Sequence, residues 1–180
     1  MKKLLFQLTA VAITALATTS KLNAQSAITT AMLDPQKQTI EDFKNSSPSA
    51  SNKNLMGISP KAVKDFSKNY KKITTENWSI IADGFTAKFI LDGVTSSVYY
   101  DTKGRWSGVL KSYPEAKLPA EIRQIVKRSY YDYSIIYVAE IETVLSEGTP
   151  TYVVYVEDDK SIKWLRIFDN EMEEYKVVLK

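Results

Sequence analysis

The side chains with the most obvious capacity for chemistry in this sequence are two groups of carboxylates. The first group spans residues 157–159, and the second lies between Asp169 and Glu174. Two carboxylates that converge in a cleft can act as acid and base on a glycosidic bond. Carboxylates also bind Ca²⁺, but neither group has the spacing of an EF-hand loop. Because Asp side chains accept hydrogen bonds from the backbone of turns, we interpret both groups as solvated hairpin turns.

Most other catalytic chemistry is excluded by composition, because the chain contains no histidine and no cysteine. Imidazole bases, Ser-His-Asp and Cys-His triads, thiolate metal sites and redox pairs are therefore absent. The sequence also lacks a G-x-G-x-x-G or Walker-type loop that would hold a phosphate. We predict that the protein is not an enzyme and that it needs neither a metal nor another cofactor.

Aromatic residues are the second feature with functional potential. The chain has eleven Tyr and three Trp, and many of them fall in strand-like segments, where most should pack in the core or in cross-strand pairs. We predict that some of these rings face solvent beside an arginine, a composition typical of interface hot spots. The predicted partner-binding patch comprises Tyr99, Trp106, Tyr152, Trp164 and Arg166.

The segments that position these residues follow the order helix, then strands, twice. Ser59-Pro60 and Leu118-Pro119 each begin a run with apolar residues at helical spacing. Strand-like runs follow each helix and are separated by turn signals such as Asp92-Gly93. The expected strands cover residues 78–81, 85–91, 94–100, 106–111, 135–144, 151–157, 162–168 and 174–179.

This order predicts an α+β fold built as a tandem repeat. Each repeat is a helix plus about four antiparallel strands, with boundaries at about 60–113 and 118–180. The helices are expected to pack on one face of an antiparallel sheet, which leaves the other face in solvent. We assign residues 60–180 to one domain, since a chain of this size can bury about two-thirds of its surface on folding.

Several motifs in this domain occur together in one known family. They are Val63-x-x-Phe66-x-x-x-Tyr70, Phe85-x-Ala87-x-Phe89, Tyr99-Tyr100-Asp101-x-x-Gly104-x-Trp106 and Leu118-Pro119-x-x-Ile122. With them, residues 60–180 resemble the PepSY-like, β-lactamase-inhibitor-like proteins of Gram-negative bacteria. The second half departs from the pattern, because residues 169–172 lack the glycine of the turn at 101–104. The resemblance implies an exported tandem-repeat domain whose open sheet face binds another protein.

The N-terminus predicts export. Lys2 and Lys3 form a basic start, and residues 4–18 are mostly apolar, as in a signal peptide. This apolar stretch is shorter than the roughly 20 residues that span a bilayer. With Ala24 at the cleavage position, we predict a signal peptide at 1–24, a periplasmic or secreted location, and no stable membrane insertion after cleavage.

Export also changes the charge of the protein. The full chain has 24 basic and 21 acidic residues, but the segment 1–24 contains three lysines and no acid. The mature chain is therefore nearly neutral, which gives no reason to expect nucleic acid as a partner. Residues 25–59 are polar and include the Ser- and Asn-rich run 45–52, so we predict a disordered linker there.

Together, these features predict an exported, non-enzymatic binding module. Its expected partner is a protein or peptide of the cell envelope, recognised through the sheet face, with inhibition as one form of that recognition. The alternatives are a carboxylate-dependent envelope enzyme and a carrier of a small ligand.

Overall fold

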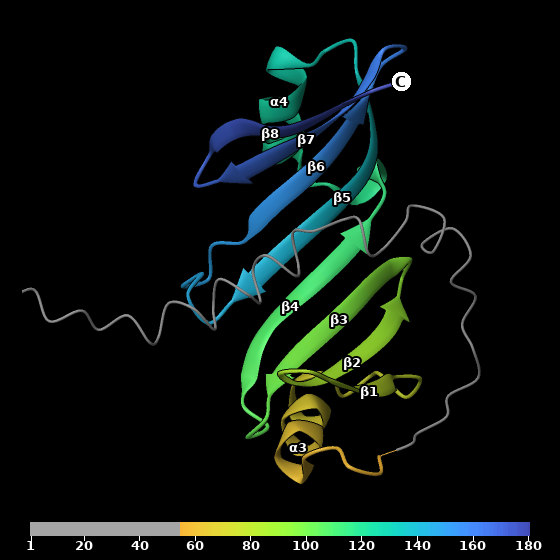
Figure 1. The fold of residues 1–180 in the computed structure, drawn as a ribbon, viewed down its shortest axis with the longest axis vertical. Coiled ribbons are helices and arrows are strands. Elements are labelled where there is room, and N and C mark those ends of the chain that lie inside the picture. Colours follow the sequence, from red (N-terminus) through yellow and green to blue (C-terminus); the bar gives the residue numbers. More distant parts are fainter. Residues whose placement is uncertain (1–54) are drawn as a thin grey trace, which may run out of the picture. The chain divides into compact units, whose positions relative to one another are not determined.

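The structure is a computed structural model that describes residues 55–180 (Figure 1). The predicted signal peptide and the predicted linker up to residue 54 lie outside the described residues. Among residues 55–180, no helix is long and apolar enough to cross a membrane.

The described elements are two α-helices, a short 3₁₀ helix and eight strands. The helices are α3 (Pro60–Asn69), η2 (Glu115–Lys117) and α4 (Ala120–Ser129). The strands are β1 (Asn77–Ile81), β2 (Gly84–Leu91), β3 (Val94–Asp101), β4 (Trp106–Tyr113), β5 (Ser134–Thr143), β6 (Thr151–Glu157), β7 (Ser161–Phe168) and β8 (Glu171–Leu179). Each strand therefore lies within a few residues of its predicted position.

All eight strands belong to one antiparallel sheet in the order β1-β2-β3-β4-β5-β6-β7-β8. The prediction of a tandem repeat of helix-plus-strand units was wrong in this respect. β4 and β5 pair directly over six residue pairs, from Gly108 with Thr143 to Tyr113 with Val138. The backbone ladder therefore continues across the expected boundary at 113–118, and the chain folds as a single, mostly β structure with only two α-helices in its described part.

Helix α3 packs on the first half of the sheet. Its apolar side is formed by Ala62 and Phe66, four residues apart and both buried, as expected for one face of a helix. These two side chains join a cluster that includes Ala87, Phe89 and Val98 from the strands. Rings of other residues surround Phe66, at centroid distances of 4.8 Å for Tyr70, 5.5 Å for Trp78 and 5.6 Å for Phe89.

Helix α4 packs on the second half of the sheet in a corresponding way. Its buried residues Ile122 and Val126 are again four positions apart. They form a second cluster with strand residues that include Val138, Val154 and Leu165. In Figure 1, α3 lies beside β1 to β3 and α4 beside β5 to β8.

Both helices cover the same side of the sheet. Residues that lie opposite each other in neighbouring strands point to the same face. Val98 pairs with Val109 under α3, and Val138 pairs with Val154 under α4. Tyr113 shows that these two pairs point to the same face. It lies opposite Val138, and it is four residues from Val109 along β4, so its side chain points to the same face as both. We call this side the helix face and the opposite side the open face.

Between the two clusters, the helix face carries a polar network centred on Glu140. Its carboxylate accepts hydrogen bonds from the Lys111 ammonium and from the Tyr113 hydroxyl, both at 2.6 Å. The Glu140 side chain is only 14% exposed, so both of its oxygens are satisfied where water has little access. Burial raises the pKa of Tyr113, and the neighbouring Glu140 raises it further. This network joins β4 to β5 at the border of the second cluster, to which Tyr113 also belongs.

Removing the carboxylate should weaken this central pair of strands. We expect Glu140→Ala to lower the free energy of unfolding by about 1–3 kcal/mol, because Lys111 and Tyr113 both lose their acceptor. Urea denaturation measures the change. Glu142→Ala is the matched control, since Glu142 lies on the same strand and face. Equal losses for the two variants would show that the network contributes nothing specific.

Candidate functional site

The open face carries a group of apolar residues that belong to neither core cluster. Six of them are buried although the structure describes no helix over this face. They come from the four neighbouring strands β4 to β7 and are Leu110, Ala139, Ile141, Val153, Tyr155 and Trp164. Because α3 and α4 pack on the opposite face, the burial of these six side chains does not come from the helices.

An aromatic row crosses the open face. Tyr137 of β5 lies opposite Tyr155 of β6, and Tyr155 lies opposite Trp164 of β7. The ring centroids are 5.0 Å and 5.4 Å apart with edge-to-face geometry, which is favourable for aromatic pairs. Lys176 of β8 continues the row, with its ammonium 4.8 Å from the centre of the Trp164 ring. We call Tyr137, Tyr155 and Trp164 the aromatic row.

The tyrosines of the open face are neutral at physiological pH. Burial raises the pKa of Tyr155 to about 12, although the nearby Trp164 indole acts in the opposite direction. Burial likewise raises the pKa of Tyr99 and of Tyr137. The Tyr137 hydroxyl donates to Ser112 Oγ at 2.5 Å, which links the row to β4. The hydroxyl groups of Tyr99, Tyr137 and Tyr155 are therefore neutral.

The indole N–H of Trp164 is a buried donor without an acceptor at normal hydrogen-bond geometry. A buried polar group left without a partner costs about 1–3 kcal/mol. An acceptor supplied by a bound molecule would recover that energy. This donor lies on the face where no described helix could provide the acceptor.

A charged pair borders the aromatic row. Arg166 lies on the open face two residues after Trp164, and its guanidinium forms an ion pair with Glu173 of β8. Both side chains are about half exposed, at 45% and 52%. An exposed pair of this kind contributes little to stability, so Arg166 remains available to an acidic group on a partner.

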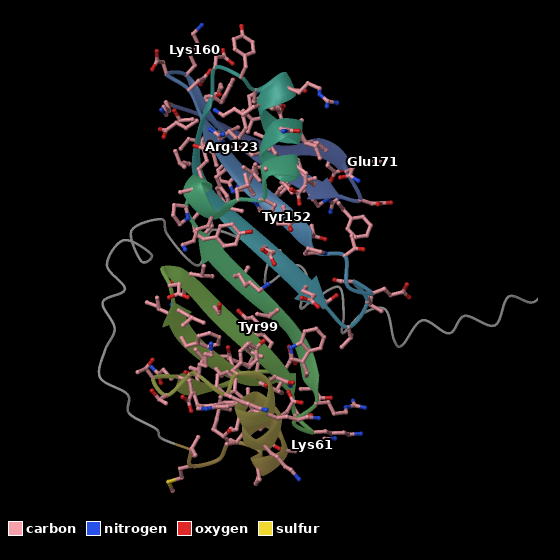
Figure 2. All side chains as sticks on the ribbon, turned by 180° about the vertical axis from the view of Figure 1, so that it is seen from behind. Lys61, Tyr99, Arg123, Tyr152, Lys160 and Glu171 are labelled. Atoms are coloured by element: carbon pink, nitrogen blue, oxygen red, sulfur yellow. The ribbon has the colours of Figure 1, made fainter. Side chains whose placement is uncertain are left out.

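The structure divides the five predicted binding residues between the two faces. Tyr99, Trp164 and Arg166 lie on the open face, as their cross-strand partners show. Trp106 lies opposite Tyr100 and packs against the α3 cluster. Tyr152 packs against the α4 cluster on the helix face, opposite Glu140. Tyr99 on β3 and Tyr152 on β6 are labelled in Figure 2.

A β-bulge determines the position of Trp106. Tyr99 pairs with Gly108, but Tyr100 pairs with Trp106, so Ser107 is the extra residue of β4. A bulge reverses the alternation of side chains beyond it. In a regular strand, Trp106 would share the face of Gly108 and Tyr99; the extra residue instead directs it toward the helix face.

Sequence reasoning missed Tyr137 and Tyr155, which form two-thirds of the aromatic row. β6 is apolar on both faces, with residues 153–156 all buried. Such a run shows no alternation that would distinguish Tyr155 from Tyr152. The odd spacing of these two tyrosines does show that they point to opposite faces. That spacing is the one signal in the sequence that could have identified the second tyrosine.

The two carboxylate groups occupy the positions of hairpin turns and a strand, and they hold local contacts. Asp158 accepts hydrogen bonds from the backbone N–H groups of Lys160 at 2.9 Å and Ser161 at 2.6 Å. In the second group, Glu174 accepts from Lys163 at 2.7 Å. Within the described part of the chain, no three acidic side chains come together in a way that could hold a metal ion.

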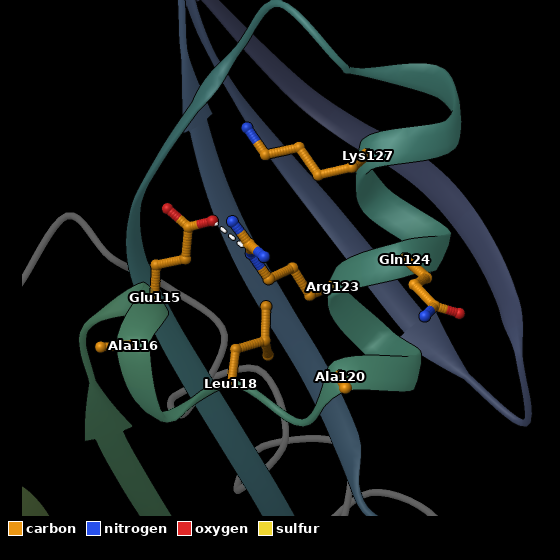
Figure 3. Close-up of a pocket in the computed structure, with 7 residues that line it drawn as sticks. All are labelled: Glu115, Ala116, Leu118, Ala120, Arg123, Gln124 and Lys127. Carbon is orange, nitrogen blue, oxygen red and sulfur yellow. Dashed lines mark hydrogen bonds and ion pairs between the residues drawn. The ribbon is translucent and has the colours of Figure 1, made fainter.

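A depression with a volume of about 510 Å³ lies between η2 and α4 (Figure 3). Arg123 and Lys127 are the cations that line it. The Arg123 guanidinium donates to Glu115 at 2.6 Å, and the Lys127 ammonium donates to the backbone carbonyl of Tyr133. The open face is the stronger candidate for recognition, because it brings three aromatic side chains together whereas no aromatic side chain lines the depression.

No protein-family model and no curated protein matches this chain. Several solved structures share its fold. A DUF2874 family protein from Bacteroides ovatus is 18% identical, with a TM-score of 0.55 over 65% of this chain and 87% of that one. A BLIP-like protein from Bacteroides fragilis is 18% identical, with a TM-score of 0.56 over 68% of this chain and 86% of that one.

A third structure with this fold is named as a candidate periplasmic protein from Bacteroides eggerthii. It is 14% identical, with a TM-score of 0.55 over 68% of this chain and 88% of that one. At these identities the likeness concerns the fold. The comparisons therefore support the β-lactamase-inhibitor-like part of the predicted resemblance, and these three structures give no support to its PepSY-like part.

Proposed function

We propose that this protein is an exported, non-enzymatic binding module of the periplasm that recognises a protein or peptide through its open face. The aromatic row carries this proposal. It places two tyrosines and a tryptophan in contact across three strands, on a face that no described helix covers. Large aromatic side chains near an arginine are the residues that dominate the energy of protein interfaces.

Two further observations support this function. The structures of similar fold include a BLIP-like protein and a candidate periplasmic protein, which agrees with a binding role in the envelope. The buried Trp164 N–H lacks an acceptor, and a backbone carbonyl of a bound polypeptide would supply one. Inhibition would be one outcome of such binding.

The proposed contact surface consists of the aromatic row with Tyr99 and Arg166. Tyr99 lies opposite Gly108, so no cross-strand side chain on β4 competes for the space beside its ring. A direct role for Trp106 and Tyr152 would require a second contact on the helix face, because both pack beside the helices.

A pair of charge reversals tests the surface. Arg166→Glu should weaken partner capture about tenfold, which corresponds to about 1.4 kcal/mol, because it places a negative charge beside Glu173 on the proposed interface. Arg123→Glu is the matched control, since Arg123 also forms an exposed ion pair but lies on α4. Capture is measured from envelope extract with the protein purified after export.

Photo-crosslinking locates the contact independently of any change in affinity. A photoreactive residue at Ser97, on the open face of β3, should crosslink to the captured partner. The same residue at Gln124, exposed on α4, should not. Equal crosslinking from both positions, together with equal capture by the two charge-reversal variants, would contradict recognition through the open face.

A further inference from the structure

A β-bulge in β8 places Lys176 on the open face, at the end of the aromatic row. Arg166 and Trp164 are two positions apart on β7, whereas their partners Glu173 and Lys176 are three positions apart on β8. In a regular strand, residues three positions apart point to opposite faces. The extra residue of β8 brings both side chains to the open face, and bulges often re-aim a side chain in this way beside functional sites.

The Lys176 ammonium is held over the ring of Trp164, 4.8 Å from the ring centre. Lys176 is partly buried and Trp164 is buried, so the ring replaces part of the water that would otherwise surround the charge. An ammonium group has three N–H donors. The donors that do not face the ring remain available to an acceptor outside the sheet.

Lys176 differs from the neighbouring cations of the open face because it has no carboxylate partner. Arg166 forms an ion pair with Glu173, and Lys180, which follows β8, forms one with Glu157 at 2.6 Å. Among residues 55–180, no carboxylate forms an ion pair with Lys176. The two pairs cancel each other's charges, so the positive charge of Lys176 remains uncompensated beside the aromatic row.

The surroundings of the row contain no free negative charge that could compensate for Lys176. On the open face, the paired positions of β4 and β5 hold only glycine, leucine, serine, alanine, isoleucine and threonine. Glu171 also lies on this face, opposite Phe168 at the β7–β8 turn. It is five residues from Lys176, a separation on the order of 15 Å along the strand. The missing negative charge must therefore come from another molecule if Lys176 is to form an ion pair.

We propose that Lys176 determines the specificity of the open face by selecting a polypeptide segment in which an acidic residue adjoins apolar residues. This inference rests on the proposed function and names the chemistry of its partner. The apolar side chains of the segment cover the aromatic row, and the Asp or Glu carboxylate accepts a hydrogen bond from the Lys176 ammonium. At Arg166 the same carboxylate would have to compete with Glu173, whereas at Lys176 it breaks no existing ion pair.

The first test selects binders of the immobilised exported protein from a random peptide library displayed on phage. Peptides that bind the wild-type protein should be enriched in Asp and Glu by about twofold, the effect of one exposed ion pair. Lys176→Gln should abolish this enrichment, and Lys176→Glu should replace it with enrichment of Lys and Arg. Lys163→Gln is the matched control and should keep the enrichment. The Lys163 ammonium also lies over an aromatic ring, 5.3 Å from the centre of Tyr130, but it is on the helix face.

The second test measures the contact between the two charges in one selected peptide. Changing the acidic residue of that peptide to its amide should weaken binding to the wild-type protein about three- to fivefold. The same change should leave binding to Lys176→Gln unaltered, because the charge that the carboxylate contacts is already absent. Fluorescence anisotropy gives the four dissociation constants, and their double-mutant cycle gives the coupling between the charges. Circular dichroism verifies that each protein variant is folded.

Photo-crosslinking of the selected peptides from Ser97 and from Gln124 separates failure of this inference from failure of the proposed function. Peptides that crosslink at Ser97 but lack acidic enrichment, or keep it with Lys176→Gln, would overturn the role of Lys176 and leave the open face as the binding surface. Loss of the enrichment in Lys163→Gln as well would assign it to net charge and would also overturn that role. Crosslinking at Gln124 alone, or a library without binders, would overturn the proposed function and this inference with it.

Discussion

Gly84→Ala should be among the most damaging single substitutions in this protein. Gly84 begins β2 with φ of +146°, and an added Cβ would lie 2.0 Å from the carbonyl oxygen of Tyr100. That oxygen belongs to the backbone of β3, and Gly84 is the cross-strand partner of Asp101. Neither strand can move away without breaking the backbone hydrogen bonds between β2 and β3. We expect a loss of more than about 4 kcal/mol in the free energy of unfolding, or failure to fold.

Gly148→Ala separates the steric effect from the backbone effect. Gly148 also has a positive φ, +83°, but no atom lies within 4 Å of its added Cβ. Gly148→Ala should therefore lower the free energy of unfolding only by the cost of a positive φ for alanine, about 1–2 kcal/mol. Guanidinium denaturation of the two variants measures both values. Similar values for Gly84→Ala and Gly148→Ala would show that β2 and β3 are not held as closely as the structure indicates.

Phe66→Ala should have the second large effect. Phe66 is 2% exposed and contacts the rings of Tyr70, directly after α3, Trp78 of β1 and Phe89 of β2. Truncating a buried phenylalanine to alanine costs about 3–5 kcal/mol, because it removes apolar contacts and leaves a cavity. Phe66→Leu preserves most of the volume and should cost less than about 1.5 kcal/mol.

The form of the unfolding curve tests the continuity of the sheet. β4 and β5 pair over six residues and share the Glu140 network, so the two halves should unfold together. Phe66→Ala near β1 and Leu165→Ala under α4 should therefore shift one common transition. Fluorescence and circular dichroism should report the same midpoint in each variant. Two separate transitions in Phe66→Ala would show that the halves are independently stable.

The same continuity matters for the proposed function. The aromatic row lies on β5 to β7, whereas Tyr99 lies on β3. The direct pairing of β4 with β5 keeps these residues on one face of one sheet. A partner could therefore contact both halves at once, with no hinge between the contacts.

Much of the secondary structure could be predicted from the sequence. The alternation of polar and apolar residues in 85–91, and turn signals such as Asp92-Gly93, identified strands near their observed positions. The two helix starts were equally clear: Pro60 is the first residue of α3 and Pro119 directly precedes α4, and apolar residues follow each proline at helical spacing. Each of these signals involves only a few neighbouring residues, so the local backbone structure can be predicted from them without knowledge of long-range contacts.

The architecture and the site depended on contacts that the sequence does not specify locally. The similarity of the two halves predicted a tandem repeat, but the pairing of β4 with β5 makes one sheet. The extra residue at Ser107 directs Trp106 to the helix face. β6 is apolar on both sides, so its pattern could not show which tyrosine joins the open face.

The sequence by itself determined that common catalytic residues are absent, and it identified aromatic rings as the candidates for recognition. It also supplied Trp164, Tyr99 and Arg166 as three members of the proposed surface. The tertiary structure alone decided which rings meet, because Tyr137, Tyr155 and Trp164 come from three strands joined only by cross-strand register. Register depends on the whole ladder of hydrogen bonds and on its bulges, and these arise only when distant segments pair.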